Sequence, residues 1–365
     1  AAFCSSFQSS SWMVGIRGSD SLMRFTRCNW YIDYRRKTTG LPSGACYHSV
    51  SLSRECTMSG IVLHQYAESP FSEKVRSILG YKGVSYQSVE IPMIMPRPDT
   101  IPLTGGYRKT PVMQVGADVY CDTAIICRVI DEIYPENTIY PEEHLGMINT
   151  VAHWTDTFLF KVCVAIAFQP KAAATNPLFQ DDSAMSAFMA DRAEFSKGSS
   201  ELVMPFEIAE PHFIGHLNQL DQQLSVGGPF LFGDKPSIAD FSTYHNVWFV
   251  YTREALRDYF SPFEHLLAWY EKMVSFGHGD VEMIPGSEAL AQASASEPEE
   301  MMDAAFLDNF QAGQLVSVMP IDYGFQPVIG ELLAAGMDEI AVVRNDDQVG
   351  RIVVHFPRTG FQIVE

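Results

Sequence analysis

Apolar and polar positions alternate in short runs from residue 61 onward, and two stretches with helical spacing interrupt them. Runs typical of strands cover Ile61–Tyr66, Val84–Ile91, Val112–Val115 and Val119–Cys121. Helical spacing covers Pro70–Lys82 and Asp122–Ile133. Gly116-Ala117-Asp118, between the last two strands, is a hairpin signal. The order β-α-β, then β-β-α, predicts an α/β domain over residues 59–137, with helices covering a sheet.

The strand pattern disappears after Pro141, and long helical patterns replace it. They cover Glu142–Phe168, Ala184–Lys197, Glu201–Leu224, Ile238–Val250 and Phe263–Val274. This predicts an all-α region, a helical bundle domain, over residues 142–305. Ser237 and Asp240 have the spacing of an N-capping box, which we expect to be structural and to contribute about 1 kcal/mol.

The spacing of hydrophobic positions changes once more near the C-terminus, from helical spacing to the alternation typical of strands. Glu288–Asp308 reads as helical or as a linker, and four strand-like runs follow at Leu315–Met319, Glu339–Arg344, Gly350–His355 and Phe361–Val364. We expect a small β-rich unit over residues 311–365. A unit of about fifty residues would be marginally stable alone, so it should dock on the rest of the chain. The residues of this tail suggest no chemistry.

Residues 1–57 differ from the rest of the chain. They are rich in Ser, show no sustained period, and hold seven Lys/Arg against three Asp/Glu, a net charge of +4. Two interpretations remain open: an organelle-targeting leader, since such leaders are rich in Ser and Arg, or sequence upstream of a start at Met58. We favour the second because no amphipathic helix is evident. Residues 1–58 are excluded from the fold prediction and are expected to be disordered.

Composition and charge narrow the class of protein. Hydrophobic residues make up 47% and charged residues 19% of the chain, which is typical of a globular protein. The net charge of −19 disfavours nucleic acid and anionic membranes as partners. No apolar run is long enough to cross a bilayer, so we expect a soluble protein. Cys121, Cys127 and Cys163 lack the spacing of a disulfide framework and suggest a reducing, cytoplasmic location.

Three short motifs follow one another in the α/β region. They are SPFSEKVR at residues 69–76, KTPVM at residues 109–113 and YCDTAI at residues 120–125. The first resembles the segment that opens the first helix of glutathione transferases, and the second resembles their cis-proline strand. The third resembles the turn that binds the γ-glutamyl end of glutathione. Because their order and spacing also fit, the chain is identified as similar to the glutathione S-transferase family.

The resemblance implies a thioredoxin-like, glutathione-binding domain followed by a helical domain for an acceptor substrate. Glutathione would be the co-substrate, an electrophilic small molecule its partner, and no metal would take part. The family also leads us to expect a homodimer. The β-rich tail lies outside the family plan.

Ser69 is the candidate catalytic residue. A transferase must hold glutathione as a thiolate, and a helix N-terminus with a hydroxyl donor stabilises such an anion. Ser69 directly precedes Pro70, and proline favours the first helical position. The alternative is that Ser69 only caps the helix. Ser72 and Tyr66 are the rival hydroxyls.

The same resemblance places glutathione between two segments. A cis peptide bond before Pro111 would let Val112 bind the cysteinyl part through its backbone, next to Thr110. Asp122 and Thr123 would hold the γ-glutamyl end, and their alternative role is a plain helix cap. Lys109, or less directly Arg97 or Arg108, would attract the glycyl carboxylate. The loop over residues 102–108 departs from the Asn-Pro-x-Gly-like segment usual in the family.

The motif also excludes one reaction. Ser69 and Ser72 stand where redox members of the fold carry Cys-x-x-Cys, so dithiol exchange by the protein is not expected. Three functions stay open: a transferase, a non-catalytic glutathione-binding or regulatory module, and a glutathione-dependent isomerase, dehalogenase or lyase. Candidates for the acceptor wall are Trp154, Phe158, Phe160 and Phe168. His212 and His216 have metal-ligand spacing but no evident third ligand, and are expected to be a surface pair.

Overall fold

The structure is a computed structural model that describes residues 60–173, 181–299, 301, 306–307 and 309–364. The described residues belong to one compact unit. The predicted boundaries after residues 137 and 305 fall inside this unit, so the division into three segments remains a proposal. The predictions for residues 1–58 lie outside the described residues.

The first region is the predicted thioredoxin-like βαβ-ββα arrangement. Its elements are β1 (Ile61–Gln65), α1 (Pro70–Lys82), β2 (Ser85–Glu90), α2 (Ile101–Thr104), β3 (Val112–Val115), β4 (Asp118–Cys121) and α3 (Thr123–Ile133). Strand β1 pairs in parallel with β2 and antiparallel with β3, which forms a hairpin with β4. The short helix α2 was not predicted, because it is one turn inside the Pro-rich connection.

Helix α1 is buried on all sides, although its sequence pattern suggests only one apolar face. Pro70 opens the helix after the Ser69 cap, and Gly83 ends it with a φ of 64°. Glu73, Lys74 and Arg76 expose only 2%, 1% and 7% of their surface. They are buried because α3 packs on one side of α1 and helix α9 (Ile238–Tyr251) on another. The charged residues of α1 must therefore find partners inside the protein.

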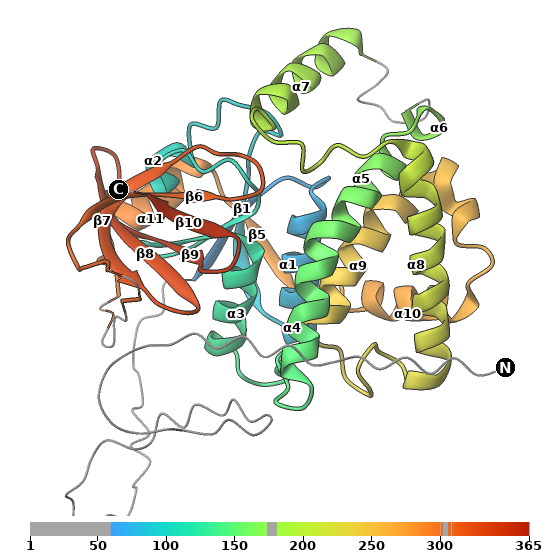
Figure 1. The fold of residues 1–365 in the computed structure, drawn as a ribbon. Helices are drawn as coiled ribbons and strands as arrows, with labels where there is room; N and C mark the ends of the chain where they lie inside the picture. The colour runs from blue at the N-terminus through green and yellow to red at the C-terminus, as the bar shows by residue number, and fades with distance from the viewer. Residues whose placement is uncertain (1–59, 174–180, 300, 302–305, 308, 365) are drawn as a thin grey trace, which may run out of the picture. The chain divides into compact units, whose positions relative to one another are not determined.

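The second region is helical, as predicted. Its elements are α4 (Leu145–Trp154), a π-turn (Thr155–Leu159), α5 (Phe160–Ala167), α6 (Pro170–Ala173), α7 (Asp182–Phe195), α8 (Phe206–Gly227), α9, a 3₁₀ turn (Glu254–Tyr259), α10 (Glu264–Ser275) and α11 (Gly286–Ser294). In Figure 1, α4 and α5 run on from one another in front of α9, and α8 lies on their far side from the sheet. Among the described helices, none has the length and apolar character needed to cross a membrane.

The predicted capping box of α9 is present and extends into the core. The Asp240 carboxylate accepts hydrogen bonds from the backbone N–H and the hydroxyl of Ser237, at 2.9 and 3.0 Å. It also accepts from the Leu231 N–H at 2.8 Å and from the Trp269 indole at 3.0 Å. Asp240 thus joins three segments of the helical region, which a local cap alone would not do.

The C-terminal strands are built into the main sheet. They are β6 (Leu315–Pro320), β7 (Val328–Ala335), β8 (Glu339–Asp346), β9 (Gly350–Pro357) and β10 (Phe361–Val364). Strand β9 pairs in parallel with β4, and β5 (Asp280–Met283) pairs with β2 at the opposite edge. The result is one ten-stranded sheet in the order β10-β6-β7-β8-β9-β4-β3-β1-β2-β5. The predicted β-rich tail therefore exists, but it continues the thioredoxin-like sheet.

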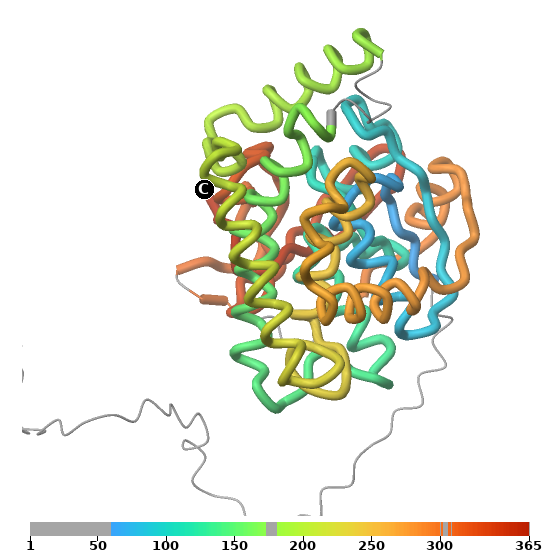
Figure 2. The backbone as a smooth tube through the Cα atoms, turned by 90° about the vertical axis from the view of Figure 1, so that its right-hand side faces the viewer, coloured from blue at the N-terminus to red at the C-terminus, as the bar shows by residue number. Residues whose placement is uncertain are grey.

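The three regions meet around the start of α1. Figure 2 views the chain from the side of the helical bundle, with the yellow and gold helices in front and the red tail strands behind them. One core cluster runs from Leu63 of β1 through Ile78 of α1 to Trp269 of α10. A second cluster joins Val119 of β4 to Val354 of β9. Packing thus fixes α1 and α3 between the helical bundle and the tail.

Candidate functional site

A cavity of about 780 Å³ lies where the three regions meet. Its walls come from the start of α1, the segment before β3, the start of α3, helices α4, α5 and α7, the end of α9 and three loops of the tail. Seven basic residues line it: Lys74, Arg97, Arg108, Lys109, Arg128, Arg192 and Arg253. Five acidic residues line it as well: Glu68, Asp122, Asp156, Asp322 and Asp338. This excess of positive charge in a protein of net charge −19 favours an anionic ligand.

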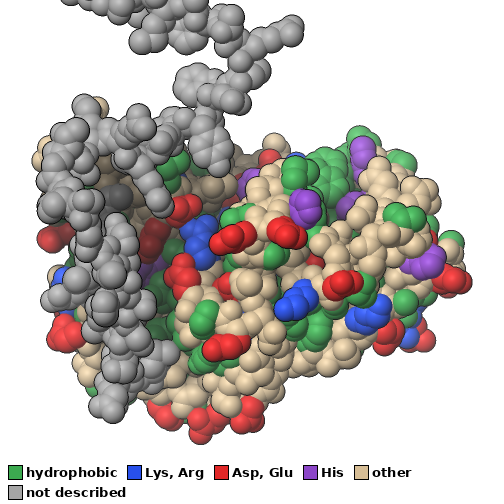
Figure 3. All heavy atoms as spheres, turned by 90° about the horizontal axis from the view of Figure 1, so that it is seen from below, with side chains coloured by type: hydrophobic (Ala, Val, Ile, Leu, Met, Phe, Trp, Pro, Cys, Tyr) green, Lys and Arg blue, Asp and Glu red, His purple; other side chains and the backbone are tan. Residues whose placement is uncertain are grey.

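The outer surface has a different charge balance. In the space-filling view of Figure 3, acidic side chains are spread over the visible face, and basic side chains form a few isolated groups among them. An anion would therefore be repelled by much of the surface and attracted at the cavity.

Ser69 lies at the N-terminus of α1 and in the wall of the cavity. Its Oγ accepts a hydrogen bond from the Ser72 N–H at 3.2 Å, so the predicted cap is present. A hydroxyl that accepts at one lone pair keeps its proton for donation to another atom. Of the rivals, Ser72 is buried and does not line the cavity, whereas Tyr66 does. Burial raises the pKa of Tyr66 although Arg192 and Arg97 oppose this, so its hydroxyl is neutral at neutral pH.

The predicted cis-proline is observed, and the residue before it is bound by Arg97. The Thr110–Pro111 peptide bond is cis, and both residues line the cavity. The Val112 side chain is buried in the core beside them and is not part of the lining. The Thr110 hydroxyl accepts a hydrogen bond of 2.8 Å from Arg97 Nη1.

Arg97 and Arg108 already have partners in the protein. Besides Thr110, Arg97 donates to three backbone carbonyls, those of Pro92, Met93 and Arg108. Arg108 Nη2 lies 2.6 Å from Asp191 Oδ1. Both guanidinium groups hold the loop before β3 in place, so neither is free for a ligand carboxylate.

Asp122 and Thr123 form the N-terminus of α3 and line the cavity together. Asp122 has a φ of 89°, a backbone conformation that costs free energy for a residue with a Cβ. Its Oδ1 accepts from the Ala124 N–H at 2.9 Å, so the capping role is present. Burial raises the pKa of Asp122, and the positive charge of Lys109 opposes this rise. Residues with a strained backbone of this kind are frequent in binding sites.

A buried ion pair that the sequence analysis did not identify lies beneath these residues. Lys74 Nζ is 2.7 Å from Asp156 Oδ2 and donates to the Thr123 hydroxyl at 3.4 Å. Asp156 Oδ1 lies 2.9 Å from His245 Nε2. Burial alone would lower the pKa of Lys74, but the charge of Asp156 raises it. Burial alone would raise the pKa of Asp156, but Lys74 and His245 lower it, so the pair is charged.

Nothing local in the sequence singles out this pair. Lys74 sits among other polar residues of α1, and Asp156 falls within an unbroken helical pattern. In the structure Asp156 lies in the π-turn between α4 and α5. Such turns are frequent at functional sites, since they turn side chains out of helical register.

The tail contributes directly to the cavity, which corrects the expectation that it carries no chemistry. Asp322, in the loop between β6 and β7, binds Lys109 Nζ with both oxygens, at 2.7 and 2.8 Å. The Lys109 ammonium also lies 4.3 Å from the centre of the Tyr323 ring. Lys109 is therefore not free, and its predicted role toward a glycyl carboxylate would require it to be shared with Asp322.

The acceptor side of the cavity is aromatic. Of the predicted candidates, Phe160 and Phe168 line the cavity, and the sequence analysis missed Phe188 and Phe249, which also line it. Trp154 and Phe158 are not among the lining residues. They pack against the two histidines that had been weighed as metal ligands: Trp154 against His216 at 5.0 Å, and Phe158 against His212 at 5.6 Å. Among the described residues no group of three or more His, Cys, Asp or Glu could hold a metal.

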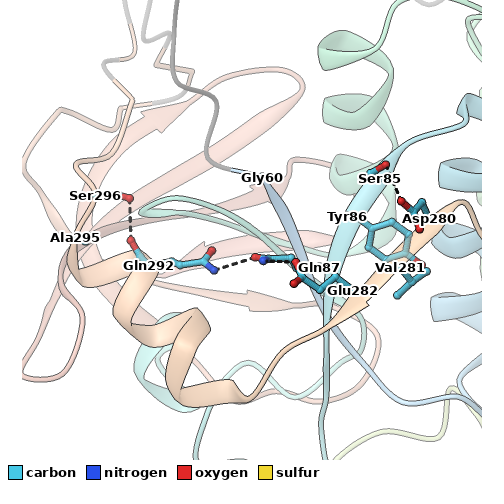
Figure 4. A pocket seen from close by; sticks show the side chains of 10 residues that line it. All are labelled: Gly60, Ser85, Tyr86, Gln87, Asp280, Val281, Glu282, Gln292, Ala295 and Ser296. Atoms are coloured by element: carbon cyan, nitrogen blue, oxygen red, sulfur yellow. Dashed lines mark hydrogen bonds between the residues drawn. The ribbon is translucent and has the colours of Figure 1, made fainter.

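A second hollow, of about 910 Å³, lies over β2, β5 and α11. Figure 4 shows its polar side chains joined to one another: Gln292 to Gln87 at 2.8 Å, and Gln87 to Glu282 at 2.8 Å. Its lining includes no Lys, Arg, His or Cys. Among the described lining residues there is therefore no cation for an anionic ligand and no thiol, and the first cavity remains the candidate site.

Comparisons with known proteins agree with this geometry. Residues 63–138 match the family model "Glutathione S-transferase, N-terminal domain", and residues 191–272 match "Glutathione S-transferase, C-terminal domain". The chain is 28% identical over 75 residues to Glutathione S-transferase U4 of Arabidopsis thaliana. That match covers 20% of this chain and 34% of the relative, so the chain aligns with about a third of this curated relative.

A solved structure is similar over a much longer stretch. It is a GST-like protein from Pseudomonas syringae, 35% identical, with a TM-score of 0.71. The similarity covers 84% of this chain and 100% of that protein. A match of this extent takes in both the thioredoxin-like and the helical regions. This chain belongs to the glutathione S-transferase family.

Proposed function

We propose that the chain is a glutathione transferase that binds glutathione in the 780 Å³ cavity, with its sulfur at Ser69 and an electrophile against the aromatic wall. One observation carries the proposal. Ser69 is at once the cap of α1 and part of a cavity that also contains Thr110, Pro111, Asp122 and Thr123. The residues that resemble the family motifs therefore converge on one space.

The thiol would be activated by position. Glutathione loses its thiol proton to solvent water, and the positive end of the α1 dipole with the Ser69 O–H stabilises the resulting thiolate. The sulfur then attacks an electrophilic carbon, and the C–S bond forms from the sulfur lone pair. A leaving group departs with its bonding pair, or a proton completes an addition. A hydrogen bond to a charged group contributes about 1.5–3 kcal/mol, which is the scale of the expected rate effect.

The remaining residues would position the peptide. Its γ-glutamyl ammonium would meet Asp122, and its γ-glutamyl carboxylate would meet Thr123 at the N-terminus of α3. Lys74 lies behind Thr123 and adds positive charge there. Thr110 and Pro111 would face the cysteinyl part, and Val112 would offer its backbone. Lys109 would approach the glycyl carboxylate.

The protein's own thiols are poor rivals for this chemistry. Cys121, Cys127 and Cys163 are unpaired and buried. Burial raises the pKa of Cys127 to about 12 and raises the pKa of the other two as well. Buried thiols of raised pKa are inert nucleophiles. Their reduced state supports a cytoplasmic location, and the family supports a homodimer, which sedimentation would test.

Ser69→Ala tests the mechanism, with Ser72→Ala as the matched control. Both variants lose one buried hydroxyl, but only Ser69 lines the cavity. We expect Ser69→Ala to lower kcat/KM with 1-chloro-2,4-dinitrobenzene by about 10- to 100-fold. Glutathione affinity, measured by calorimetry, should change little. Ser72→Ala should keep its activity, and Ser69→Thr should recover much of it.

Unchanged turnover in Ser69→Ala would remove Ser69 from the mechanism. A second candidate function is a non-catalytic glutathione-binding module, which the pairing of Lys109 with Asp322 favours. Glutathione binding without turnover of chlorinated, epoxide, thioether and isomerisable substrates would support that module. Turnover of only one of these classes would instead identify a dehalogenase, lyase or isomerase.

A further inference from the structure

Arg253 lies at the acceptor end of the cavity, two residues after α9 ends. Its guanidinium carbon is 4.1 Å from the centre of the Phe249 ring and 5.9 Å from that of Phe168. Nη1 donates to the carbonyl of Phe249, in the last turn of α9. Among the described residues Nε has no hydrogen-bond partner. The group is thus a cation that lies against the Phe249 ring and near the Phe168 ring.

The other basic residues of the cavity already have hydrogen-bond or ion-pair partners in the protein. Ion pairs with carboxylates hold Lys74, Arg108, Lys109, Arg128 and Arg192, and Arg97 is held by carbonyls and a hydroxyl. No carboxylate of the described chain lies within ion-pair distance of Arg253. Burial lowers its pKa to about 10, so it remains a cation at neutral pH. A partly buried charge without a counter-charge costs free energy, which an anionic ligand would recover.

Aromatic contacts connect Arg253 with the catalytic end. Phe71, in the first turn of α1, lies 4.8 Å from Phe160 between ring centres. Phe160 lies 6.3 Å from Phe249, which contacts Arg253. Phe71, Phe160 and Phe249 all line the cavity. An apolar wall therefore runs from Phe71, which follows Ser69 and Pro70, to the guanidinium of Arg253.

We propose that the acceptor substrate is an aromatic electrophile that carries a carboxylate, with its ring on Phe160, Phe168 and Phe249 and its carboxylate on Arg253. An aromatic ring gains dispersion and stacking from such a wall. The planar guanidinium matches the geometry of a carboxylate, and the bond is strengthened because both groups are charged. The reaction part of this proposal rests on the proposed function, but the binding part does not.

A matched pair of substrates tests the reaction part. In 4-chloro-3,5-dinitrobenzoate and its methyl ester, the glutathione thiolate forms a C–S bond, the C–Cl bond breaks, and chloride leaves with the bonding pair. The group opposite the chlorine is negatively charged in the acid and neutral in the ester, and the uncatalysed rates account for the different reactivity of the two rings. We expect wild-type protein to favour the acid in kcat/KM, relative to each substrate's uncatalysed rate with glutathione.

Arg253→Met removes the charge and keeps an apolar side chain of similar length. It should lower kcat/KM for the acid by about 10- to 100-fold and leave the ester within about threefold. Arg257→Met is the control, since Arg257 is exposed on the neighbouring 3₁₀ turn and does not line the cavity. It should leave both substrates unchanged. Arg253→Lys should recover part of the preference for the acid.

Binding of unreactive analogues separates this proposal from the catalytic one. Calorimetry with 4-nitrobenzoate and with methyl 4-nitrobenzoate needs no glutathione and no turnover. We expect the acid to bind wild-type protein more tightly than the ester, and Arg253→Met to abolish the difference. That result without turnover of any electrophile would reject the transferase and keep the Arg253 site. Equal affinities of acid and ester, or an unchanged preference in Arg253→Met, would overturn the inference.

Discussion

At the scale of single residues, the geometry of Ser69 allows one hydroxyl to cap α1 and to face a ligand. The cap uses an acceptor lone pair of Oγ, toward the Ser72 N–H. Activation of a thiolate would use the hydroxyl proton, toward the cavity. In the sequence analysis these roles were alternatives, because a sequence does not show which way the Ser69 hydroxyl faces. The structure places the hydroxyl in the cavity wall with its cap bond formed, so the two roles do not compete.

Two buried tyrosines give a prediction about stability. The Tyr107 hydroxyl has no hydrogen-bond partner among the described residues, whereas the Tyr244 hydroxyl donates to Glu73 Oε1 at 2.9 Å. Tyr244→Phe should lower the free energy of unfolding by about 1.5–3 kcal/mol, since it removes a bond to a charged group. Tyr107→Phe should leave it within about 0.5 kcal/mol or raise it, since no bond is lost.

Denaturation in urea, monitored by tryptophan fluorescence, measures both variants against wild type. The two substitutions remove the same atom from buried rings, so each is the control for the other. A large loss in Tyr107→Phe would show that its hydroxyl has a partner in solution. A neutral result in Tyr244→Phe would contradict the Glu73 contact.

At the scale of elements, α1 carries charge into the core because its neighbours supply complementary groups. Glu73 binds Arg76, Tyr244 and His278, at distances of 2.9 to 3.0 Å. Burial alone would raise the pKa of Glu73, but His278 and Arg76 lower it to about 2. Its stabilising contribution is therefore present above the unfolded pKa and is lost as the pH falls toward 2. This network fixes the helix whose N-terminus holds Ser69.

Ion pairs of a histidine with two carboxylates also stabilise the junction between the thioredoxin-like sheet and the tail. His355 of β9 lies opposite Tyr120 of β4, with the two rings stacked at 4.5 Å. Its Nε2 is 3.0 Å from Asp118 Oδ1, and its Nδ1 is 2.5 Å from Glu339 Oε1 of β8. Burial by itself lowers the pKa of His355, but the two carboxylates raise it above the usual value. A protonated His355 therefore links three strands.

This junction should weaken with rising pH. Because the folded pKa of His355 lies above the unfolded value of about 6.5, its contribution is complete below that pH and is lost as the pH rises through the folded pKa. We expect the stability difference between wild type and His355→Gln to be largest near pH 6 and to shrink toward pH 9. Urea denaturation at several pH values measures it. His265→Gln, on the exposed face of α10, is the control, and a constant difference across the range would refute the prediction.

Two strands escaped the sequence analysis for different reasons. Strand β7, with the sequence VIGELLAA, contains Glu, Leu and Ala, which favour helices, so its local propensity opposes its structure. Pairing with β6 and β8 outweighs this helical propensity. Gly330 is required because a Cβ there would lie 2.6 Å from the Val343 carbonyl oxygen. Strand β5 has only four residues, all exposed, so it has no apolar pattern to detect. Strand β5 depends on pairing with the distant β2, and β7 depends on pairing with its neighbours β6 and β8.

At the scale of the whole molecule, local patterns predicted the regions, and tertiary contacts decided how they join. The thioredoxin-like order, the helical bundle and the β-rich tail followed from periodicity and motifs. The pairing of β4 with β9 places Tyr120 beside His355. No local pattern predicts a contact between residues so far apart in the sequence. Most of the predicted site converges on one cavity, whereas Lys74, Asp156 and Arg253 were missed because their importance depends on burial by remote helices.

The contact between Lys109 and Asp322 joins the thioredoxin-like region to the tail in the wall of the cavity. If Lys109 attracts the glycyl carboxylate of glutathione, Asp322 opposes that attraction twice. It neutralises the ammonium, and its own carboxylate repels the ligand. The exposed fractions of the two side chains are 15% and 29%, so solvent screens the pair only in part. The tail would then set the affinity of the site for glutathione.

Asp322→Asn keeps the shape of the loop and removes the charge. We expect it to tighten glutathione binding, measured by calorimetry, by about 3- to 10-fold, since a partly exposed charge contact is worth about 1 kcal/mol. Glutathione with an amidated glycyl carboxylate should gain nothing, because it presents no charge to Lys109. Asp338→Asn is the matched control, since Asp338 also lines the cavity but lies 3.6 Å from Arg128 at the exposed rim. Equal gains for both peptides, or weaker binding of glutathione, would show that Asp322 positions Lys109 and does not oppose the ligand.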